Sequence, residues 1–250
     1  MNVGAVVLAA GFGTRLAPLT IDTPKPLLVV GGQPVASHLL ARLGQVDGLT
    51  KIVVVVNNCH LDQWHRWQTD LPPSPHVHIV SNGVTENESR PGAVADLALG
   101  IRALADRAPA VEWTFVLAGD NLLDEPLQPH LDAARSTQEP VVLCRDLGAH
   151  VPAGRFGEIT VNDIGIITRF REKPANPQSP LAATCSYVLA TTATDELARF
   201  LDSGGDADSP GEFIGWLASN RPVRARPIRG HYHDIGNHQT LALARAFYEQ

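Results

Sequence analysis

The feature that most constrains the fold is an alternation of short apolar runs with longer amphipathic stretches before residue 147. Apolar runs of strand length occupy residues 4–9, 51–56, 77–80, 114–118 and 141–144. Between them, apolar side chains recur at helical spacing within residues 35–43 and 94–104. Strands that alternate with helices form a mostly parallel sheet with helices on both faces. We therefore expect an α/β fold of the Rossmann-like type.

The pattern changes after residue 147, where predicted strands follow one another more closely. We expect strands at residues 158–161, 166–172 and 183–189, followed by helices around 196–201 and 212–218. Segments rich in turn-forming residues, which we interpret as surface loops too short for domain linkers, lie at 71–75, 174–180 and 203–211. The sequence thus predicts a single domain over residues 1–250, with the second half extending the first as a small mixed β unit.

Net charge, the first residues and the cysteines indicate which kinds of partner this protein binds and in which compartment it lies. Lys and Arg total 20 against 26 Asp and Glu, and the formal charge of −6 argues against general binding to nucleic acid or to an anionic membrane. The first residues contain no basic leader, and their apolar run is far below the ~20 residues that span a bilayer. Three widely spaced cysteines, without a C-x-x-C pair, predict reduced thiols in a cytoplasmic protein: Cys59, Cys144 and Cys185.

The loop after the first predicted strand contains the most informative residues. Glycines at the carboxyl end of such a strand allow backbone N–H groups to approach a polyphosphate, and here Gly11 and Gly13 hold these positions. Arg15 can bind phosphate oxygens with its forked guanidinium, and Lys25 supplies a second positive charge. The spacing is neither that of a P-loop nor that of a dinucleotide fingerprint, which requires a third glycine where this chain has Leu16. Taken alone, the two glycines are equally consistent with a tight turn.

The longer string is far more specific than the two glycines. Gly-x-Gly-Thr-Arg-Leu-x-Pro-Leu-Thr at residues 11–20, followed by Pro-Lys-Pro-Leu-Leu at 24–28, resembles the signature of the nucleoside-diphosphate-sugar pyrophosphorylases. This family includes glucose-1-phosphate thymidylyl- and uridylyltransferases. The resemblance implies an enzyme that transfers a nucleoside monophosphate from a nucleoside triphosphate to a sugar 1-phosphate and releases pyrophosphate. It runs in order from about residue 3 to residue 240.

The resemblance also implies a metal site. Asp120 ends an apolar run in Gly-Asp-Asn, similar to the element whose Asp holds Mg²⁺ in the family. Asp234 lies in Tyr-His-Asp-Ile-Gly-Asn, which resembles the second acidic segment except that Asn237 replaces the usual Thr. We expect Mg²⁺ as the cofactor, held by Asp120 and Asp234. We interpret His231 and His233 as solvated or hydrogen-bonded side chains outside this metal site.

Further matches suggest where each substrate binds. Phe170-Arg171-Glu172-Lys173-Pro174 is similar to the family's Glu-Lys-Pro, and Phe156-Gly157 to its aromatic-Gly pair. The resemblance therefore implies sugar-phosphate binding by Asn121, Gly157, Glu172, Lys173 and Tyr187. It implies nucleotide binding by Leu8, Ala10, Gly11, Gly13, Thr14, Arg15, Asn82, Arg90 and Gly92. It implies catalytic roles for Arg15, Lys25, Asp120 and Lys173.

Several alternatives stay open at the level of sequence. Arg90 is equally compatible with the nucleotide or with surface pairs to Glu86 or Glu88, and the family's base-reading Gln is missing, so the base and the sugar are undetermined. A cytidylyltransferase for a non-sugar phosphate and a catalytically silent nucleotide-binding regulatory subunit are the rival functions. A glycosyltransferase would show Asp-x-Asp where this chain has Gly119-Asp120-Asn121. We expect no C-terminal β-helix and a homo-oligomer, either a dimer or a tetramer.

Overall fold

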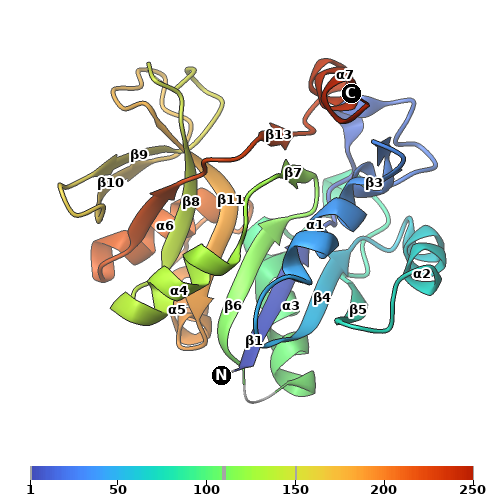
Figure 1. Cartoon of the computed structure of the whole chain (residues 1–250), viewed down its shortest axis with the longest axis horizontal. Helices are drawn as coiled ribbons and strands as arrows, with labels where there is room; N and C mark the ends of the chain where they lie inside the picture. The colour runs from blue at the N-terminus through green and yellow to red at the C-terminus, as the bar shows by residue number, and fades with distance from the viewer. Residues whose placement is uncertain (1, 109–110, 150, 250) are drawn as a thin grey trace.

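The apolar runs of the first half form the parallel centre of one twisted sheet (Figure 1). The computed structural model describes residues 2–108, 111–149 and 151–249. In the order β6–β1–β4–β5 the strands are β6 (Val111–Ala118), β1 (Asn2–Leu8), β4 (Leu49–Val56) and β5 (His76–Ser81), and their pairings are parallel. Because all four strands run in one direction, their carboxyl ends meet at the same edge of the sheet.

Helices cover both faces of this sheet, as the alternating sequence pattern predicts (Figure 1). On β1, Val3, Ala5 and Val7 belong to one apolar cluster, whereas Val6 points into the cluster on the opposite face. The first cluster is covered by α1 (Val35–Leu43), α2 (Leu61–Thr69) and α4 (Gln128–Thr137). The second is covered by α3 (Ala93–Arg107), α5 (Ala193–Asp202) and α6 (Pro210–Asn220).

The second half of the chain extends the same sheet in mixed orientation. Its long strand β11 (Leu181–Ala190) pairs antiparallel with β6 and continues the sheet to β9 (Glu158–Val161) and β10 (Ile167–Arg171). Beside β11 lie β8 (Val141–Asp146) and, parallel to β8, β12 (Arg224–Pro227). The predicted mixed β extension is therefore confirmed, and the sheet remains continuous through both halves.

In a third apolar cluster, the C-terminal segment packs against residues from the first part of the chain. Here α7 (His238–Tyr248) packs near the short hairpin of β2 (Val29–Val30) and β3 (Gln33–Pro34), while β13 (Tyr232–Asp234) pairs antiparallel with β7 (Asn121–Leu123). Leu16, Leu122 and Ile235 are all completely buried in this cluster. Short 3-10 helices are η1 (Thr14–Leu16), η2 (Lys25–Leu27) and η3 (Asn87–Ser89). The cluster thus fixes the glycine loop, the end of β6 and β13 against one another.

The predicted α/β class is confirmed, and each predicted strand and helix lies within or beside an observed one. The pattern did not identify α2, α4, α7 or the short strands β7, β12 and β13. Within the described ranges, no helix combines the length and apolarity needed to cross a membrane.

Candidate active site

The two acids predicted to hold a metal lie side by side. Asp120 follows β6 directly, and Asp234 ends β13, which pairs with β7 so that Asp234 lies opposite Asn121. The Ile235 N–H donates to the Asp120 carbonyl oxygen at 3.1 Å, which fixes the two segments together. Burial raises the pKa of Asp234, and the neighbouring Asp120 carboxylate raises it further. Two carboxylates that share one partly buried position are a ready site for a cation.

Cations predicted from the glycine loop surround this acidic pair. Lys25 forms an ion pair with Asp120, and the charges of Lys25 and Arg15 both act to lower the pKa of Asp234. The loop reaches this position because Gly13 adopts φ of 64° and begins η1, where its carbonyl accepts the Thr20 hydroxyl at 2.9 Å. The left-handed turn therefore places Arg15 and Lys25 at the carboxyl ends of the central strands.

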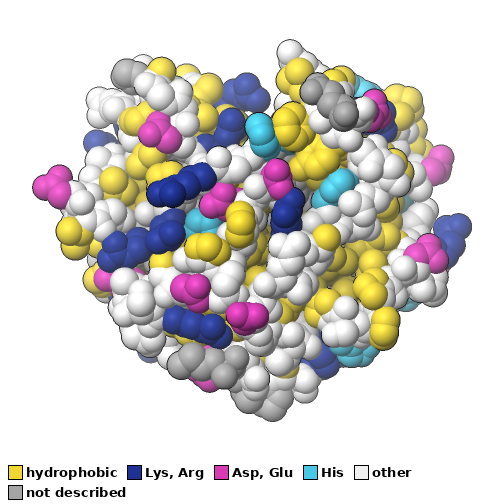
Figure 2. Space-filling view, in the orientation of Figure 1, with side chains coloured by type: hydrophobic (Ala, Val, Ile, Leu, Met, Phe, Trp, Pro, Cys, Tyr) yellow, Lys and Arg dark blue, Asp and Glu magenta, His cyan; other side chains and the backbone are white. Residues whose placement is uncertain are grey.

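A central cavity of about 480 Å³ joins the acids to cations from both halves of the chain. Figure 2 shows the molecular surface hollowed between the lobe of β9 and β10 and the lobe of α7, where this edge of the sheet opens. The predicted site residues that line the central cavity are Arg15, Asp120, Asn121, Lys173 and Asp234. Residues separated by more than 200 positions therefore face one space, as the sequence predicted.

Lys173 enters the central cavity in an unusual backbone conformation. Its φ of 40° is rare for a residue with a side chain, and such conformations concentrate at functional sites. Its ammonium lies 3.1 Å from the Glu172 carboxylate, and its side chain remains 58% exposed. Lys173 is thus held beside the cavity and is free to contact an anion there.

Beside the central cavity lies a chamber of about 150 Å³, which we call the Glu172 chamber. It is lined by Gly157, Phe170, Glu172, Tyr187 and Gly211, together with residues shared with the central cavity. A Cβ atom on Gly211 would lie 2.1 Å from a Glu172 carboxylate oxygen, so only glycine permits this close approach. The predicted residues Gly157, Glu172 and Tyr187 therefore meet in one small chamber.

On the other side, the glycine loop borders a chamber of about 180 Å³, which we call the loop chamber. The predicted residues Leu8, Ala10, Gly11 and Lys25 line it, and Asp120 separates it from the central cavity. It also contains Asp96, a residue that the sequence analysis did not single out. Asp96 lies in the first turn of α3, is only 8% exposed and accepts a hydrogen bond from the Asn82 amide at 2.9 Å.

The other residues predicted to bind the nucleotide do not line these cavities. Gly13 and Thr14 shape the loop, and Asn82 contacts Asp96 rather than lining the loop chamber. Arg90 pairs with Asp208 at 2.6 Å, rather than with Glu86 or Glu88. Gly92 begins α3 with φ of 101°, where a Cβ atom would lie 2.2 Å from the Ala207 carbonyl oxygen.

The structure also reveals site residues that the sequence reasoning missed. Cys185 borders the central cavity, the Glu172 chamber and the loop chamber, and Thr184 lies beside it on β11. Arg155 precedes the Phe156-Gly157 pair and lines the central cavity. The sequence does offer a signal for Arg155, because it is a positively charged residue directly before the Phe156-Gly157 pair. Cys185 and Asp96 lie within ordinary strand and helix patterns, which carry no comparable signal.

The two histidines near Asp234 pack against an aromatic ring of α7. The rings of His231 and His233 lie 4.3 and 5.2 Å, centroid to centroid, from the Phe247 ring on α7. Burial lowers the pKa of His233, and the charges of His231 and Arg145 act in the same direction. Within the described ranges, no group of three or more His, Cys, Asp or Glu side chains is arranged to hold a metal ion.

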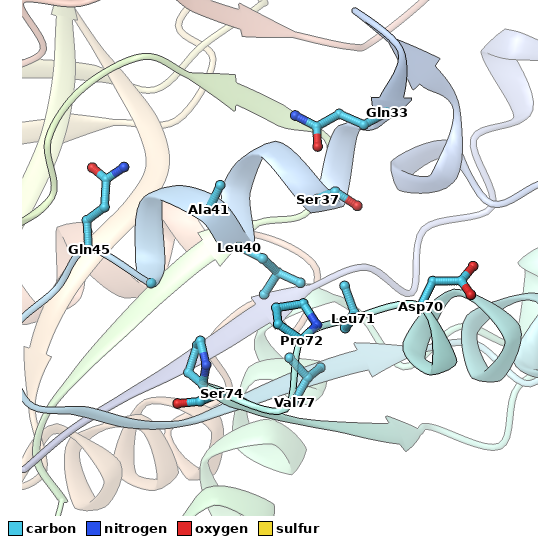
Figure 3. A pocket seen from close by; sticks show the side chains of 12 residues that line it. Gln33, Ser37, Leu40, Ala41, Gln45, Asp70, Leu71, Pro72, Ser74 and Val77 are labelled. Carbon is cyan, nitrogen blue, oxygen red and sulfur yellow. The ribbon is translucent and has the colours of Figure 1, made fainter.

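A further groove of about 460 Å³ lies between α1, the end of α2 and the start of β5 (Figure 3). Leu40, Leu71, Pro72 and Val77 converge in its middle, with Gln45 and Asp70 toward its rim. Its lining contains none of the residues that the sequence predicts for substrates or metal. The groove is therefore distinct from the candidate active site.

The fold closely resembles those of solved nucleotidyltransferases. A Bacillus anthracis structure named for glucose-1-phosphate thymidylyltransferase, in complex with sucrose, superposes with a TM-score of 0.83 at 22% identity and covers 99% of this chain and 96% of its own. A structure of UDP-glucose pyrophosphorylase with UDP-glucose gives a TM-score of 0.81 at 18% identity over 100% of this chain and 99% of its own. At these identities the likeness establishes the fold.

Sequence comparison establishes the family. A UTP–glucose-1-phosphate uridylyltransferase of Haloferax volcanii is 31% identical over 93% of this chain and 90% of its own length. A glucose-1-phosphate adenylyltransferase of Bacillus licheniformis is 25% identical over 95% of this chain, which spans only 65% of that relative. Residues 4–250 match the family described as nucleotidyl transferase. The chain therefore belongs to the nucleotidyl transferase family.

Proposed function

We propose that this protein transfers a nucleoside monophosphate from a nucleoside triphosphate to a sugar 1-phosphate, giving a nucleoside-diphosphate sugar and pyrophosphate. One observation carries the proposal: Asp120 and Asp234 meet in a single cavity with Arg15 and Lys173. The uridylyltransferase and adenylyltransferase to which the chain is similar are named for glucose 1-phosphate, which supports a sugar phosphate as the acceptor.

The donor set in the cavity fits Mg²⁺. This ion usually binds through one or two carboxylates plus substrate phosphates and retains several waters, so the Asp120 and Asp234 carboxylates suffice. Their adjacency, with Asp234 raised in pKa by burial and by Asp120, leaves negative charge that a cation would compensate. When bound, Mg²⁺ would supply charge neutralisation at the reacting phosphates.

The residues of the chain would align two anions and neutralise their charge. We assign the triphosphate to the loop chamber, where Gly11 allows close backbone approach, and Arg15 in the adjoining central cavity would neutralise the leaving pyrophosphate. Lys173 would hold the acceptor phosphate, and Glu172 would accept hydrogen bonds from sugar hydroxyls in the Glu172 chamber. Because the attacking phosphate oxygen is already an anion, the reaction needs no general base.

Lys25 has two successive partners in this scheme. Without substrate its ammonium pairs with Asp120, which keeps the acidic site partly neutral. With a triphosphate and a metal bound, Asp120 would hold the metal and the Lys25 ammonium would be available to pair with the phosphates. We therefore assign Lys25 to charge neutralisation on the nucleotide side.

The activity is tested by a matrix of nucleoside triphosphates against sugar 1-phosphates and non-sugar phosphates, with pyrophosphate release as the readout. We expect Mg²⁺-dependent turnover with at least one sugar 1-phosphate. Asp120→Asn and Asp234→Asn should each reduce kcat at least about 100-fold, because each removes a charged metal ligand. The matched control Asp163→Asn changes an exposed acid between β9 and β10 and should retain wild-type rates. Full turnover by Asp120→Asn with Mg²⁺ would remove Asp120 from the metal site.

Lys173 offers an independent test of the acceptor side. Lys173→Ala should raise KM for the sugar phosphate by about tenfold and leave KM for the nucleoside triphosphate nearly unchanged, because its ammonium borders the Glu172 side of the cavity. Equal effects on both Michaelis constants would contradict the assignment of Lys173 to the acceptor.

The remaining expectations belong to the same proposal. We propose a cytoplasmic enzyme that forms a dimer or tetramer. Exposed apolar side chains at Leu19, Ile21 and Val29 support a covered surface in the segment after the glycine loop. Light scattering coupled to gel filtration measures the mass, and a mass of 26.8 kDa for the particle in solution would exclude the oligomer.

A further inference from the structure

A chamber next to the central cavity contains two arginines that the proposed reaction does not use. We call it the Arg145 chamber; it has a volume of about 240 Å³ and is lined by the cations Arg145 and Arg155, the carboxylate Asp234, and Phe156, Tyr232 and His233, among others. Arg155, Phe156 and Tyr232 also line the central cavity, so the two spaces adjoin. Arg145 lies on β8 and borders only the Arg145 chamber among the described cavities.

Both arginines are held by aromatic rings rather than by acids. The Arg145 guanidinium carbon lies 5.4 Å from the centroid of the Tyr232 ring, and that of Arg155 lies 5.3 Å from the centroid of the Phe156 ring. Stacking on a ring orients a guanidinium while leaving its N–H donors free for an oxyanion. The chamber thus contains two guanidinium groups whose N–H donors are held in a fixed orientation.

Within the part of the chain that the structure describes, neither guanidinium group forms a hydrogen bond or an ion pair at contact distance. Arg155 acts only through its charge on Asp234. By contrast, Arg42, Arg171 and Arg224 each pair with a carboxylate. The two guanidinium groups therefore leave an excess of positive charge beside the central cavity in a chain whose net charge is −6.

The reacting phosphates do not account for these two cations. The proposed reaction already assigns Arg15, Lys25 and Lys173 to the reacting phosphates, and a metal on Asp120 and Asp234 would supply more charge. We propose that the Arg145 chamber binds a second anionic group of the acceptor, a carboxylate or a further phosphate. The proposal rests on the proposed function and names the class of acceptor: a sugar phosphate that carries an additional oxyanion.

The test compares acceptors that differ by one anionic group. With the active nucleoside triphosphate, kcat/KM is measured for glucose 1-phosphate, glucuronic acid 1-phosphate and glucose 1,6-bisphosphate. We expect the wild type to favour at least one of the two acceptors with an additional anionic group over glucose 1-phosphate by about tenfold or more, mainly through KM. A preference for glucuronic acid 1-phosphate identifies a carboxylate, and one for the bisphosphate identifies a phosphate.

Arg145→Gln should remove this preference, whereas Arg145→Lys, which keeps the charge, should restore part of it. The matched control Arg102→Gln changes an exposed arginine on α3 and should retain the wild-type ratio of kcat/KM values. Circular dichroism verifies that each variant is folded. Equal kcat/KM for all three acceptors in the wild type, or the same preference in Arg145→Gln, would overturn the proposal.

A binding measurement separates failure of this inference from failure of the proposed function. Isothermal titration calorimetry of glucose 1,6-bisphosphate and glucose 1-phosphate, with Mg²⁺ present, needs no turnover. Tighter binding of the bisphosphate that Arg145→Gln reduces about tenfold supports the anion chamber even if pyrophosphate release is never observed. Identical binding of both probes, or no binding of the bisphosphate, overturns it even if the enzyme turns over glucose 1-phosphate.

Discussion

Asp96 is a buried carboxylate that lines the loop chamber and is separate from Asp120 and Asp234, the two acids proposed to bind a metal. Burial raises its pKa, the hydrogen bond from the Asn82 amide lowers it, and the charge of Asp208 raises it. The net shift is upward, so ionised Asp96 destabilises the folded chain at neutral pH. A nucleoside that donates a hydrogen bond from a ribose hydroxyl or an amino group would use this acceptor.

Asp96→Asn should therefore stabilise the ligand-free protein at pH 7 by on the order of 0.5 kcal/mol, since it removes a desolvated charge and retains an acceptor for Asn82. Because the folded-state pKa of Asp96 is raised, the wild type gains stability relative to the variant as the pH falls toward 4. Urea unfolding at pH 7 and pH 4 measures both effects. A variant less stable than the wild type at pH 7 would show that the charge is stabilising.

The cysteines differ in reactivity for a similar reason. Burial raises the pKa of Cys144 and that of Cys185 to about 12, and the carboxylates near Cys185 act in the same direction. At pH 8 such a thiol is only about one part in ten thousand thiolate, the reactive form. Cys59 is exposed.

Iodoacetamide at pH 8 should therefore modify Cys59 first, with Cys185 and Cys144 reacting at least about 100-fold more slowly. Peptide mass spectrometry over time gives the three rates in one experiment, and Cys144 serves as the internal control for burial. Modification of Cys185 as fast as that of Cys59 would show that its thiol is ionised at the junction of the chambers.

At the scale of elements, Glu158 connects the strands of the β extension to the loop after β10. Its side chain, at the start of β9, accepts hydrogen bonds from the Ser179 N–H at 2.6 Å and the Arg171 Nε at 2.6 Å, and also from the Gln178 N–H. Desolvation acts to raise its pKa, but these donors outweigh it and the pKa is lowered. The same loop begins with Glu172 and Lys173, so Glu158 acts on the site through its neighbours.

Glu158→Gln should destabilise the protein by about 1–3 kcal/mol, because a charge-assisted acceptor of backbone donors is lost. It should also raise KM for the acceptor, since the segment that presents Lys173 loses its anchor. As the folded-state pKa of Glu158 is lowered, the difference in stability should be present above pH 5 and disappear as the pH falls through that lowered value. Thermal unfolding across this pH range measures it; an unchanged melting temperature at pH 7 would contradict the role.

The sequence predicted the elements with strong periodicity and missed those that tertiary contacts create. The apolar runs of β1, β4 and β6 are continuous because both faces of these strands are covered. By contrast, α2 is nine residues long and buries only Trp64 and Trp67, too few apolar positions for a clear helical stripe. Short helices of this kind are stabilised mainly by packing against the surrounding core.

The same distinction applies to the candidate site. Asp120 and Asp234 could be singled out from the sequence because each lies in a recognisable motif. The pairing of β13 with β7 brings the two residues together. The pairing of Arg90 with Asp208 spans 118 positions and depends on how the 203–211 loop packs against α3, which no local pattern encodes. The Arg145 chamber was equally invisible, because its walls come from β8, β13 and α7.

At the scale of the whole molecule, the candidate site forms where the C-terminal segment packs against the first half of the chain. Asp120 lies just after the central strand β6, and Asp234 ends β13 in the C-terminal segment. Leu16, Leu122 and Ile235 join both to the glycine loop in the third apolar cluster. Without a cation, the two carboxylates oppose each other and Lys25 compensates only in part. A metal bound between them would connect segments from both halves and favour the folded state.

Mg²⁺ should therefore raise the melting temperature of the ligand-free protein. At about five times its dissociation constant, an ion that binds only the folded state contributes roughly 1 kcal/mol, which corresponds to about 2–4 °C for a chain of this length. Differential scanning fluorimetry in MgCl₂, against NaCl at equal ionic strength, measures the shift. Asp234→Asn should abolish it without lowering the melting temperature in NaCl, because the variant removes a buried charge that Asp120 repels. If Asp163→Asn loses the shift as completely as Asp234→Asn does, Mg²⁺ stabilises the protein elsewhere and the two acids are not its site.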